Sequence, residues 1–544
     1  MIDTYDLINS LKERAGQMAY SSFLYDWSLS GDAPDRLIVR PADPWKGDTD
    51  KASQLLIAAG VGERTGPQWY GAWWEPEDSD EIWAAHMHSF VWLRDLRALG
   101  GGLAREQGRL MIETWIERYK SWDATSWRSD VLGKRLSMWI SHYDYFCAAA
   151  DEEFQDAFLT SLHKQAKHLS NALGNVREME FFDSVKGLLY AGLALEGQER
   201  WVDYALGALE KSLERQILQD GGHASRSPAM LLKALEALAD IKSALVAGDR
   251  HVPEFLEETV QSMCAAVRFF RHGDRRMALF HGAQENENTH IDSLLAQAGA
   301  RGKAKYSLPF SGFERASLGR SLLLLDVGKS PEPAFDEITH ASPLAFEFSY
   351  GNTRILTSCG AHPSSKDWNE ALRFTAAHNT ATLDYRNACE IRKDGHFGRK
   401  VTEFSLERQE NNEAVLLQAS HNGYVALNGI THARKLYLGD EGHDLRGEDD
   451  FTAKGKVMRP VEIALRFHLH PGISISLDKD SGDALLTAPG GSRWRFSLSA
   501  GALALEDSLY LGKGVTPRKT KQMAIYGQMS ESFAQVKWRL KQEK

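Results

Sequence analysis

The sequence predicts an α+β protein of at least two domains, a helical array or toroid followed by a large antiparallel β-sandwich. Apolar residues recur every three or four positions through roughly the first 300 residues, which is typical of amphipathic helices. Beyond about residue 310 they alternate with polar residues, which is typical of strands with one buried face. The basic segment at 300–312 has neither period. We therefore predict a helical domain at 1–305 and a sandwich domain at 306–544.

The helical half carries clear start and stop signals. Phe154, Phe158 and Leu162 are spaced four apart with charged or polar residues between them, which predicts one apolar helix face. Ser227 followed by Pro228 predicts a helix start, because the hydroxyl can cap the first turn and proline loses no hydrogen bond there. An apolar stripe at 231–245 follows this pair, and a glycine comes shortly after it. Many such helices without strand signals favour a helical array or toroid.

The second half reads as strands and turns. Apolar residues at 461, 463, 465, 467 and 469 alternate with polar or small ones, and a similar run covers 493–498. Arg466, His468 and His470 share the polar face of the first run. Two imidazoles on one strand face can bind a metal ion, or they can simply be solvated. Because spacing identifies no third ligand, we predict no metal and no other cofactor, although a structural divalent metal near these histidines remains open.

Composition excludes several classes. The chain has 64 basic and 74 acidic residues, a net charge of −10, which argues against nucleic-acid binding. No apolar run approaches the roughly 18 residues of a spanning helix, so we expect no membrane segment. Four widely spaced cysteines form no CxxC pair, and we expect buried free thiols. The N-terminus lacks a secretory signal, so we predict a cytoplasmic protein, or a periplasmic one if the chain is a mature form.

Three polar segments are candidates for chemistry. Residues 170–175 place Asn171 and Asn175 around a glycine, and residues 220–228 hold His223 and Arg226 just before a helix start. A helix N-terminus with such donors attracts anions. In the second half, Arg373 precedes a His378–Asn379 pair at a strand start. Each segment also has an ordinary interpretation, as a capping turn, a linker, or a structural histidine.

At these same segments the chain resembles the heparinase II/III-like polysaccharide lyases. The resemblance is carried by Asp43-Pro44-Trp45 with Gly47-Asp48, by residues 171–195 with Asn175 and Lys186 to Gly192, by residues 216–228, by residues 375–380, and by residues 445–449 and 467–472. The stretches follow the family's order across most of the chain. The resemblance implies an incomplete (α/α) toroid followed by an antiparallel β-sandwich, an active cleft between them, and cleavage of a uronic-acid glycan by β-elimination.

This chemistry assigns roles to the matching residues. An amide or guanidinium must stabilise the charge that develops next to the uronate carboxylate, and a base and an acid must move protons. By resemblance, Asn175 is the neutraliser, with help from Arg226, and His378 is the base or acid. His223 is a further catalytic candidate. Expected substrate-binding residues are Arg226, Arg373, Asn379, Arg135, Trp139 and Tyr190, of which Arg135 and Trp139 share a helix face.

The chain departs from the family pattern at several positions. Ala229 and Met230 stand where family lyases often have a catalytic tyrosine, and Val176 stands where a histidine is common. His223, Tyr190 or Tyr350 would then have to replace the tyrosine. Thr380 stands where some relatives have an imidazole, so the resemblance gives no metal site.

Three functions therefore stay open. The leading one is a lyase acting on an acidic polysaccharide or oligosaccharide. A non-catalytic protein that binds acidic glycans or assists polysaccharide assembly is the second. The third is a glycoside hydrolase on a helical toroid, which needs two opposed carboxylates such as those of Glu178, Glu180 and Asp183. The sequence does not define the oligomeric state.

Overall fold

The computed structural model describes residues 16–58, 74, 81–499 and 501–543. The chain divides into two compact units. Unit 1 comprises residues 1–213 and 236–257, and unit 2 comprises residues 214–235 and 258–544. The secondary structure changes from helix to strand between residues 297 and 307. The compact units divide the chain differently from the predicted domains at 1–305 and 306–544, because residues 214–235 and 258–297, which include parts of helices and the loops between them, group with the strands.

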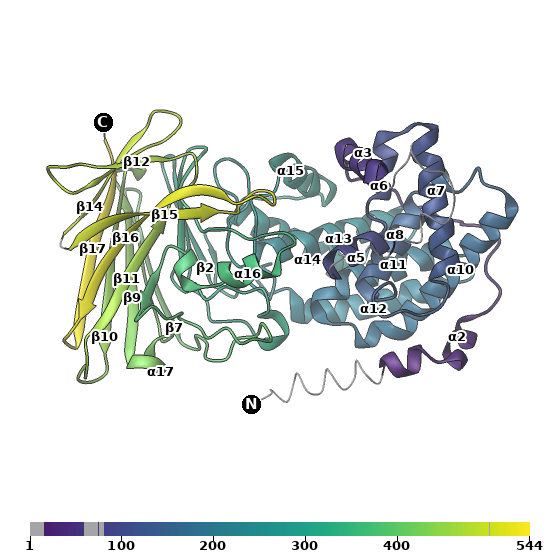
Figure 1. The fold of residues 1–544 in the computed structure, drawn as a ribbon, viewed down its shortest axis with the longest axis horizontal. Coiled ribbons are helices and arrows are strands. Elements are labelled where there is room, and N and C mark those ends of the chain that lie inside the picture. The colour runs from purple at the N-terminus through teal and green to yellow at the C-terminus, as the bar shows by residue number, and fades with distance from the viewer. Residues whose placement is uncertain (1–15, 59–73, 75–80, 500, 544) are drawn as a thin grey trace. The chain divides into compact units, whose positions relative to one another are not determined.

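Unit 1 is built from helices. They are α2 (Phe23–Leu29), α3 (Thr49–Ala58), α5 (Glu81–Ser89), α6 (Leu93–Leu99), α7 (Gly101–Arg118), α8 (Ser129–Ser141), α9 (Tyr143–Phe146), α10 (Glu152–Ala172) and α11 (Phe181–Ala194), with the 3-10 turns η1 (Leu173–Asn175) and η2 (Glu178–Glu180) (Figure 1). The Asp151 side chain caps α10 by accepting a hydrogen bond from the Phe154 amide, and Phe154, Phe158 and Leu162 are buried as their spacing predicts.

Helices α8 and α11 pack unusually closely. A Cβ atom added to Gly187 on α11 would lie 2.4 Å from both Cα and the carbonyl oxygen of Gly133 on α8. Every residue of α11 is buried. The two glycines therefore let the helix backbones touch, which no larger residue would permit.

Three further helices contribute residues to both units: α12 (Glu199–Gln216), α13 (Pro228–Ala247) and α14 (Glu254–Phe269). Helix α13 starts and stops where the sequence predicts. The Met230 amide donates to Oγ of Ser227 at 3.4 Å, Pro228 is the first helical residue, and Gly248 follows the last. Unit 2 also contains α15 (Asn288–Gln297), α16 (Lys366–Leu372) and α17 (Val425–Asn428). Among the described residues, none of the helices has the length and apolar character needed to span a membrane.

The strands of unit 2 form three sheets in which every strand pair is antiparallel. The first contains β1 (Ser307–Leu308), β2 (Phe313–Leu318), β3 (Ser321–Asp326), β4 (Phe346–Tyr350) and β5 (Thr353–Leu356) in that order. The second, in the order β12-β13-β14-β17-β10-β9-β8-β7, contains β7 (Phe404–Glu410), β8 (Val415–His421), β9 (Ile430–Gly439), β10 (Asp444–Ala453), β12 (Ser474–Leu477), β13 (Ala484–Thr487), β14 (Arg493–Leu498) and β17 (Phe533–Gln542). The third, in the order β15-β16-β11-β6, contains β6 (Ala381–Leu383), β11 (Val461–His468), β15 (Ala502–Tyr510) and β16 (Arg518–Met529).

One hydrophobic core joins the three sheets. The ring of Trp538 on β17 stacks on Phe346 of β4 with 5.6 Å between centroids, and it meets Phe467 of β11 edge-on at 4.9 Å. The apolar residues of β11 face this core, as their alternation predicts. The opposite face of β11 is more covered than the sequence suggests, because Ala464 and His468 are buried as well.

Candidate functional site

The loop between α12 and α13 carries His223 and Arg226, and it folds against one serine of the sandwich. The two carboxylate oxygens of Asp220 accept hydrogen bonds from the amide and the hydroxyl of Ser311, both at 2.7 Å. Gly221 has a φ of 86°, and a Cβ added there would lie 2.2 Å from the carbonyl oxygen of Ser262. The Asp-Gly-Gly sequence is therefore needed for tight packing within unit 2.

His223 is fully enclosed by this loop. Its Nδ1 accepts a hydrogen bond from the Ser225 amide at 3.1 Å, so the ring proton lies on Nε2, which donates to Oε1 of Gln216 at 3.2 Å. Burial lowers the pKa of His223 to about 3, with a smaller contribution from Lys233. The neutral imidazole of His223 is 1% exposed, and both of its nitrogens are hydrogen-bonded within the chain. It therefore stabilises the loop.

Arg226 lies at the centre of a buried charge network. Its guanidinium donates to the carbonyl oxygens of Ser311 at 2.7 Å and Gly312 at 3.1 Å, and it forms an ion pair with Asp326 at the end of β3. The other oxygen of Asp326 lies 3.0 Å from Nε2 of His281. Burial alone would raise the pKa of Asp326, but the charge of Arg226 and the contact with His281 outweigh it and hold the pKa below its usual value.

A chain of three imidazoles continues from this network. Nδ1 of His281 accepts a hydrogen bond from the His340 amide at 3.1 Å, and the His340 ring lies 4.8 Å from the ring of His378. Nε2 of His378 donates to the Leu372 carbonyl oxygen at 3.0 Å, and Nδ1 lies 3.1 Å from the Ser358 hydroxyl. Burial lowers the pKa of His378 to about 3.

Two other predicted residues of unit 2 are equally enclosed. Arg373 donates to three carbonyl oxygens, those of Asp336, Thr339 and Gly395, at 2.6–3.0 Å. The Asn379 amide group donates to the Phe346 carbonyl oxygen at 2.8 Å and accepts from the His468 amide at 2.6 Å. The side chains that the sequence selected for chemistry in unit 2 are thus close together, but each is bound to the chain itself.

The predicted residues of unit 1 do not form a site with one another. Arg135 is 0% exposed and donates to Gln165 and to the carbonyl oxygens of His88 and Ser126, and Trp139 is 1% exposed. The structure does not support our expectation that these two side chains contact a ligand, because both pack inside the helical core. Asn175 is exposed at the end of η1. That it faces the histidines of unit 2 stays a prediction.

A polar cluster in unit 1 joins two of the resembling stretches. The Trp45 indole donates to Asp240 at 3.1 Å, and the Lys186 ammonium lies 3.2 Å from the same carboxylate. Burial, together with the charges of Asp240 and Asp43, raises the pKa of Tyr190 well above its usual value, so this phenol is a poor proton donor in this environment. Tyr190 is 3% exposed.

The structure gives no support for a metal centre on the His-x-His segment. Nδ1 of His468 lies 2.8 Å from the Ser508 hydroxyl and its Nε2 donates to the Ala376 carbonyl oxygen, whereas Nε2 of His470 lies 3.5 Å from Glu285. The two imidazoles therefore have separate partners. Within the part of the chain that the structure describes, no group of three or more His, Cys, Asp or Glu side chains could hold a metal ion.

Sequence reasoning missed Asp326, His281 and His340. A carboxylate at the end of the all-buried strand Ser321–Asp326 was a usable signal, because a buried charge needs a charged or hydrogen-bonding partner. His281 and His340 carry no comparable local pattern.

The fold is that of a helical toroid followed by an antiparallel β-sandwich. Two family models cover most of the chain, "Heparinase II/III N-terminus" over residues 73–300 and "Heparinase II/III-like, C-terminal" over residues 300–539. The chain belongs to the heparinase II/III-like family, for which polysaccharide lyase is the class at family level. The family resemblance and the toroid-plus-sandwich fold predicted from the sequence are confirmed.

The chain is also similar to individual proteins of known name or structure. It is 30% identical over 539 residues to the FtsZ-localized protein C of Caulobacter vibrioides, covering 93% of this chain and 90% of that protein. Among solved structures, a heparinase III (BT4657 gene product) matches with a TM-score of 0.68 at 15% identity, covering 91% of this chain and 89% of that one. The heparan sulfate lyase HepC from Pedobacter heparinus matches with a TM-score of 0.63 at 15% identity, covering 99% and 88%. At these identities the structural matches show the fold alone.

Proposed function

We propose that this chain is a glycan-binding member of the heparinase II/III-like family that acts without β-elimination. Its ligand class is an acidic polysaccharide or oligosaccharide, as the family resemblance implies. This corresponds to the second of the three functions that the sequence leaves open.

One observation carries the proposal: both histidines expected to move protons are buried and hydrogen-bonded by the chain. A general base must reach the proton that it removes. Neither His223 nor His378 can do so while its nitrogens are bound to Gln216, Ser225, Leu372 and Ser358. Their pKa values of about 3 also make them very weak bases near neutral pH.

The positions where the family often has its catalytic tyrosine support the same proposal. Ala229 and Met230 in the first turn of α13 cannot transfer a proton. Tyr190, one of the possible replacements, has a raised pKa and is buried in unit 1. A binding role needs none of these groups.

The relative named for FtsZ localisation suggests where such a protein acts. We propose that this chain works in the cytoplasm at the place where FtsZ is located, because its Caulobacter relative is named for FtsZ localisation. A role in assembling an acidic envelope glycan fits this location better than digestion of an external polymer.

The test is incubation of the full chain with heparin, heparan sulfate, alginate and polygalacturonate, read by the ultraviolet absorbance of unsaturated ends. We expect no product from any of them, together with saturable binding of at least one. Product from any polymer would overturn the proposal.

A lyase remains the second candidate, because the family match favours it and the exposed Asn175 is accessible to a ligand. If unsaturated ends do appear and the variant Asn175→Ala abolishes them, the lyase interpretation replaces ours. No observation favours the hydrolase.

A further inference from the structure

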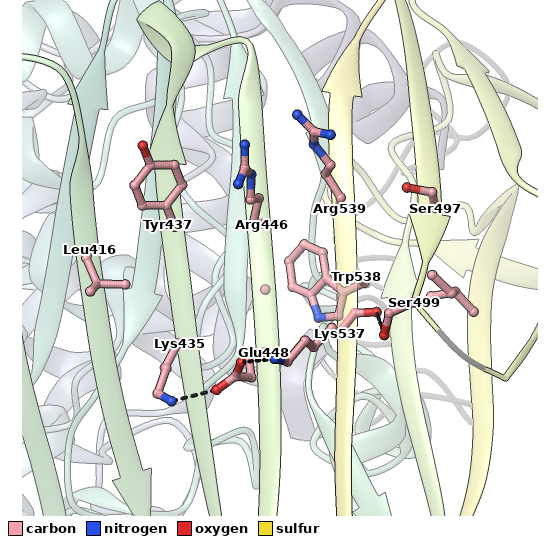
Figure 2. Close-up of a pocket in the computed structure, with 12 residues that line it drawn as sticks. Leu416, Lys435, Tyr437, Arg446, Glu448, Ser497, Ser499, Lys537, Trp538 and Arg539 are labelled. Carbon is pink, nitrogen blue, oxygen red and sulfur yellow. Dashed lines mark hydrogen bonds and ion pairs between the residues drawn. The ribbon is translucent and has the colours of Figure 1, made fainter.

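A groove lies on the outer face of the eight-stranded sheet, with a cavity volume of about 460 Å³. Figure 2 shows its side chains rising from neighbouring strands, with Tyr437, Arg446 and Arg539 at one level and Lys435, Glu448 and Lys537 at the next. The strand register explains these two rows. Arg446 pairs directly with Tyr437 and Arg539, and Glu448 pairs directly with the two lysines.

The cations of each row lie close to carboxylates. The Lys435 and Lys537 ammonium groups lie 2.5 Å and 3.1 Å from Glu448. Arg446 and Arg539 both bind Asp444, at 2.6 Å and 2.8 Å. Lys435 also lies 3.6 Å from Asp450, so two carboxylates balance the two lysines. The two arginines share Asp444 and keep one positive charge in the groove.

The cations are more exposed than their carboxylates, since the side chains of Glu448 and Asp450 are 20% and 17% exposed. The side chains of Arg446 and Lys537 are 55% and 52% exposed, whereas that of Asp444 is 2% exposed. A ligand entering the groove thus meets guanidinium and ammonium groups first. Arg446 also lies over the Tyr437 ring, 5.5 Å from its centroid, which gives the groove an aromatic wall.

The position of the groove disfavours an extended peptide as its occupant. The groove lies over β8, β9, β10, β17 and β14, whereas the edges of this sheet are β12 and β7. Extended peptides are commonly captured by backbone pairing at a sheet edge, and interior strands have no unpaired backbone groups to offer. Recognition here must come from side chains alone, which suits a ligand carrying its own anionic groups on an amphipathic ring.

We propose that this groove binds an acidic oligosaccharide, with carboxylate or sulfate groups on its exposed arginine and lysine side chains and a sugar face on Tyr437. Successive rows are two residues apart along each strand, roughly 7 Å, a spacing that can engage charged groups on one or on neighbouring sugar rings. This proposal rests on the proposed function, since it gives a site for the acidic glycan.

The experiment is titration calorimetry of the full chain with a heparin tetrasaccharide and with tetragalacturonate, at low and at moderate salt. We expect binding that weakens with salt, because surface charges are screened. The double variant Lys435→Gln/Lys537→Gln should lower the affinity about tenfold or more, since charge-assisted contacts are the strong ones. Lys519→Gln, an exposed lysine on β16 of another sheet, is the matched control and should bind as the parent does.

Further variants and ligands make the result unambiguous. The single variant Lys537→Gln leaves Glu448 paired with Lys435, so it tests the same row if the double variant folds poorly. Tyr437→Ala should weaken binding as well. Neutral maltotetraose should not bind, and tighter binding of hexaglutamate than of either glycan would overturn the oligosaccharide assignment.

The outcomes also separate this proposal from the proposed function. If both glycans bind but neither lysine variant weakens them, the groove is not the site, although glycan binding stands. If neither glycan binds, the groove proposal is wrong. The appearance of unsaturated product alongside groove-dependent binding would overturn only the non-catalytic role.

Discussion

The imidazole of His378 donates its Nε2 proton to the carbonyl oxygen of Leu372, six residues earlier, across 3.0 Å. This bond ties the start of β6 to the end of α16. Because the same ring contacts the Ser358 hydroxyl through Nδ1, the histidine bridges three segments of unit 2. Loss of these hydrogen bonds should lower the stability of the protein.

We predict that His378→Ala destabilises the protein by about 2–4 kcal/mol. The substitution leaves two buried polar partners without their bond and creates a cavity. Urea denaturation measures the effect, with His251→Ala, at an exposed position, as the control that should change little. A fully stable variant would mean that His378 is not held as described, and a catalytic role would regain support.

Acid should destabilise unit 2 at a pH where most proteins are still stable. Burial lowers the pKa of His223 and His378 to about 3 and that of His468 to about 4. In the unfolded chain each histidine binds a proton near pH 6.5, so the unfolded state gains protons first as the pH falls. Stability should therefore be fully present above about pH 6.5 and decline below it.

The slope of stability against pH shows whether the buried histidines cause this decline. Each such histidine contributes at most about 1.4 kcal/mol per pH unit. We expect urea midpoints to fall steadily from pH 7 to pH 5, and His223→Gln to make the fall shallower by removing one titrating group. A midpoint that stays constant over this interval would show that the three imidazoles titrate as they do in the unfolded chain and are open to solvent.

The network around Asp326 gives a second stability test. Asp326→Asn leaves the guanidinium of Arg226 buried without its counter-ion and weakens the partner of His281. Loss of one partner from a buried pair costs about 3–5 kcal/mol. Asp507→Asn is the control, because its ion pair with Lys521 is exposed and should shift the urea midpoint very little. Equal effects of the two substitutions would contradict the buried network.

Local patterns made part of this structure predictable from sequence. The α10 stripe at Phe154 and Phe158 and the start of α13 at Ser227 depend on residues within one or two helical turns. Whether a histidine is buried and hydrogen-bonded does not depend on such nearby residues. His378 is buried because Ser358 and the sheet close around it, and the partner of Arg226 lies 100 residues along the chain.

The family resemblance does not predict the burial of individual side chains either. Two of the resembling stretches meet in unit 1, since Trp45 and Lys186 share Asp240. The resemblance could not say whether the polar side chains there face a ligand or one another, because that depends on the packing of the whole unit. Arg135 illustrates this: a guanidinium suited to sugar binding instead lies 4.0 Å from the centroid of the Trp115 ring in the helical core.

The close contact of α8 and α11 predicts opposite effects for two glycine substitutions in unit 1. Gly187→Ala would place a Cβ atom 2.4 Å from the Gly133 backbone, so the helices must separate. Such overpacking costs about 1–3 kcal/mol. Gly207 lies within α12, is exposed, and would have nothing within 4 Å of its added Cβ. Gly207→Ala should therefore stabilise the protein by about 1 kcal/mol through helix propensity. Urea denaturation of both variants decides the matter, and a stabilising Gly187→Ala would mean that α8 and α11 do not pack through their glycines.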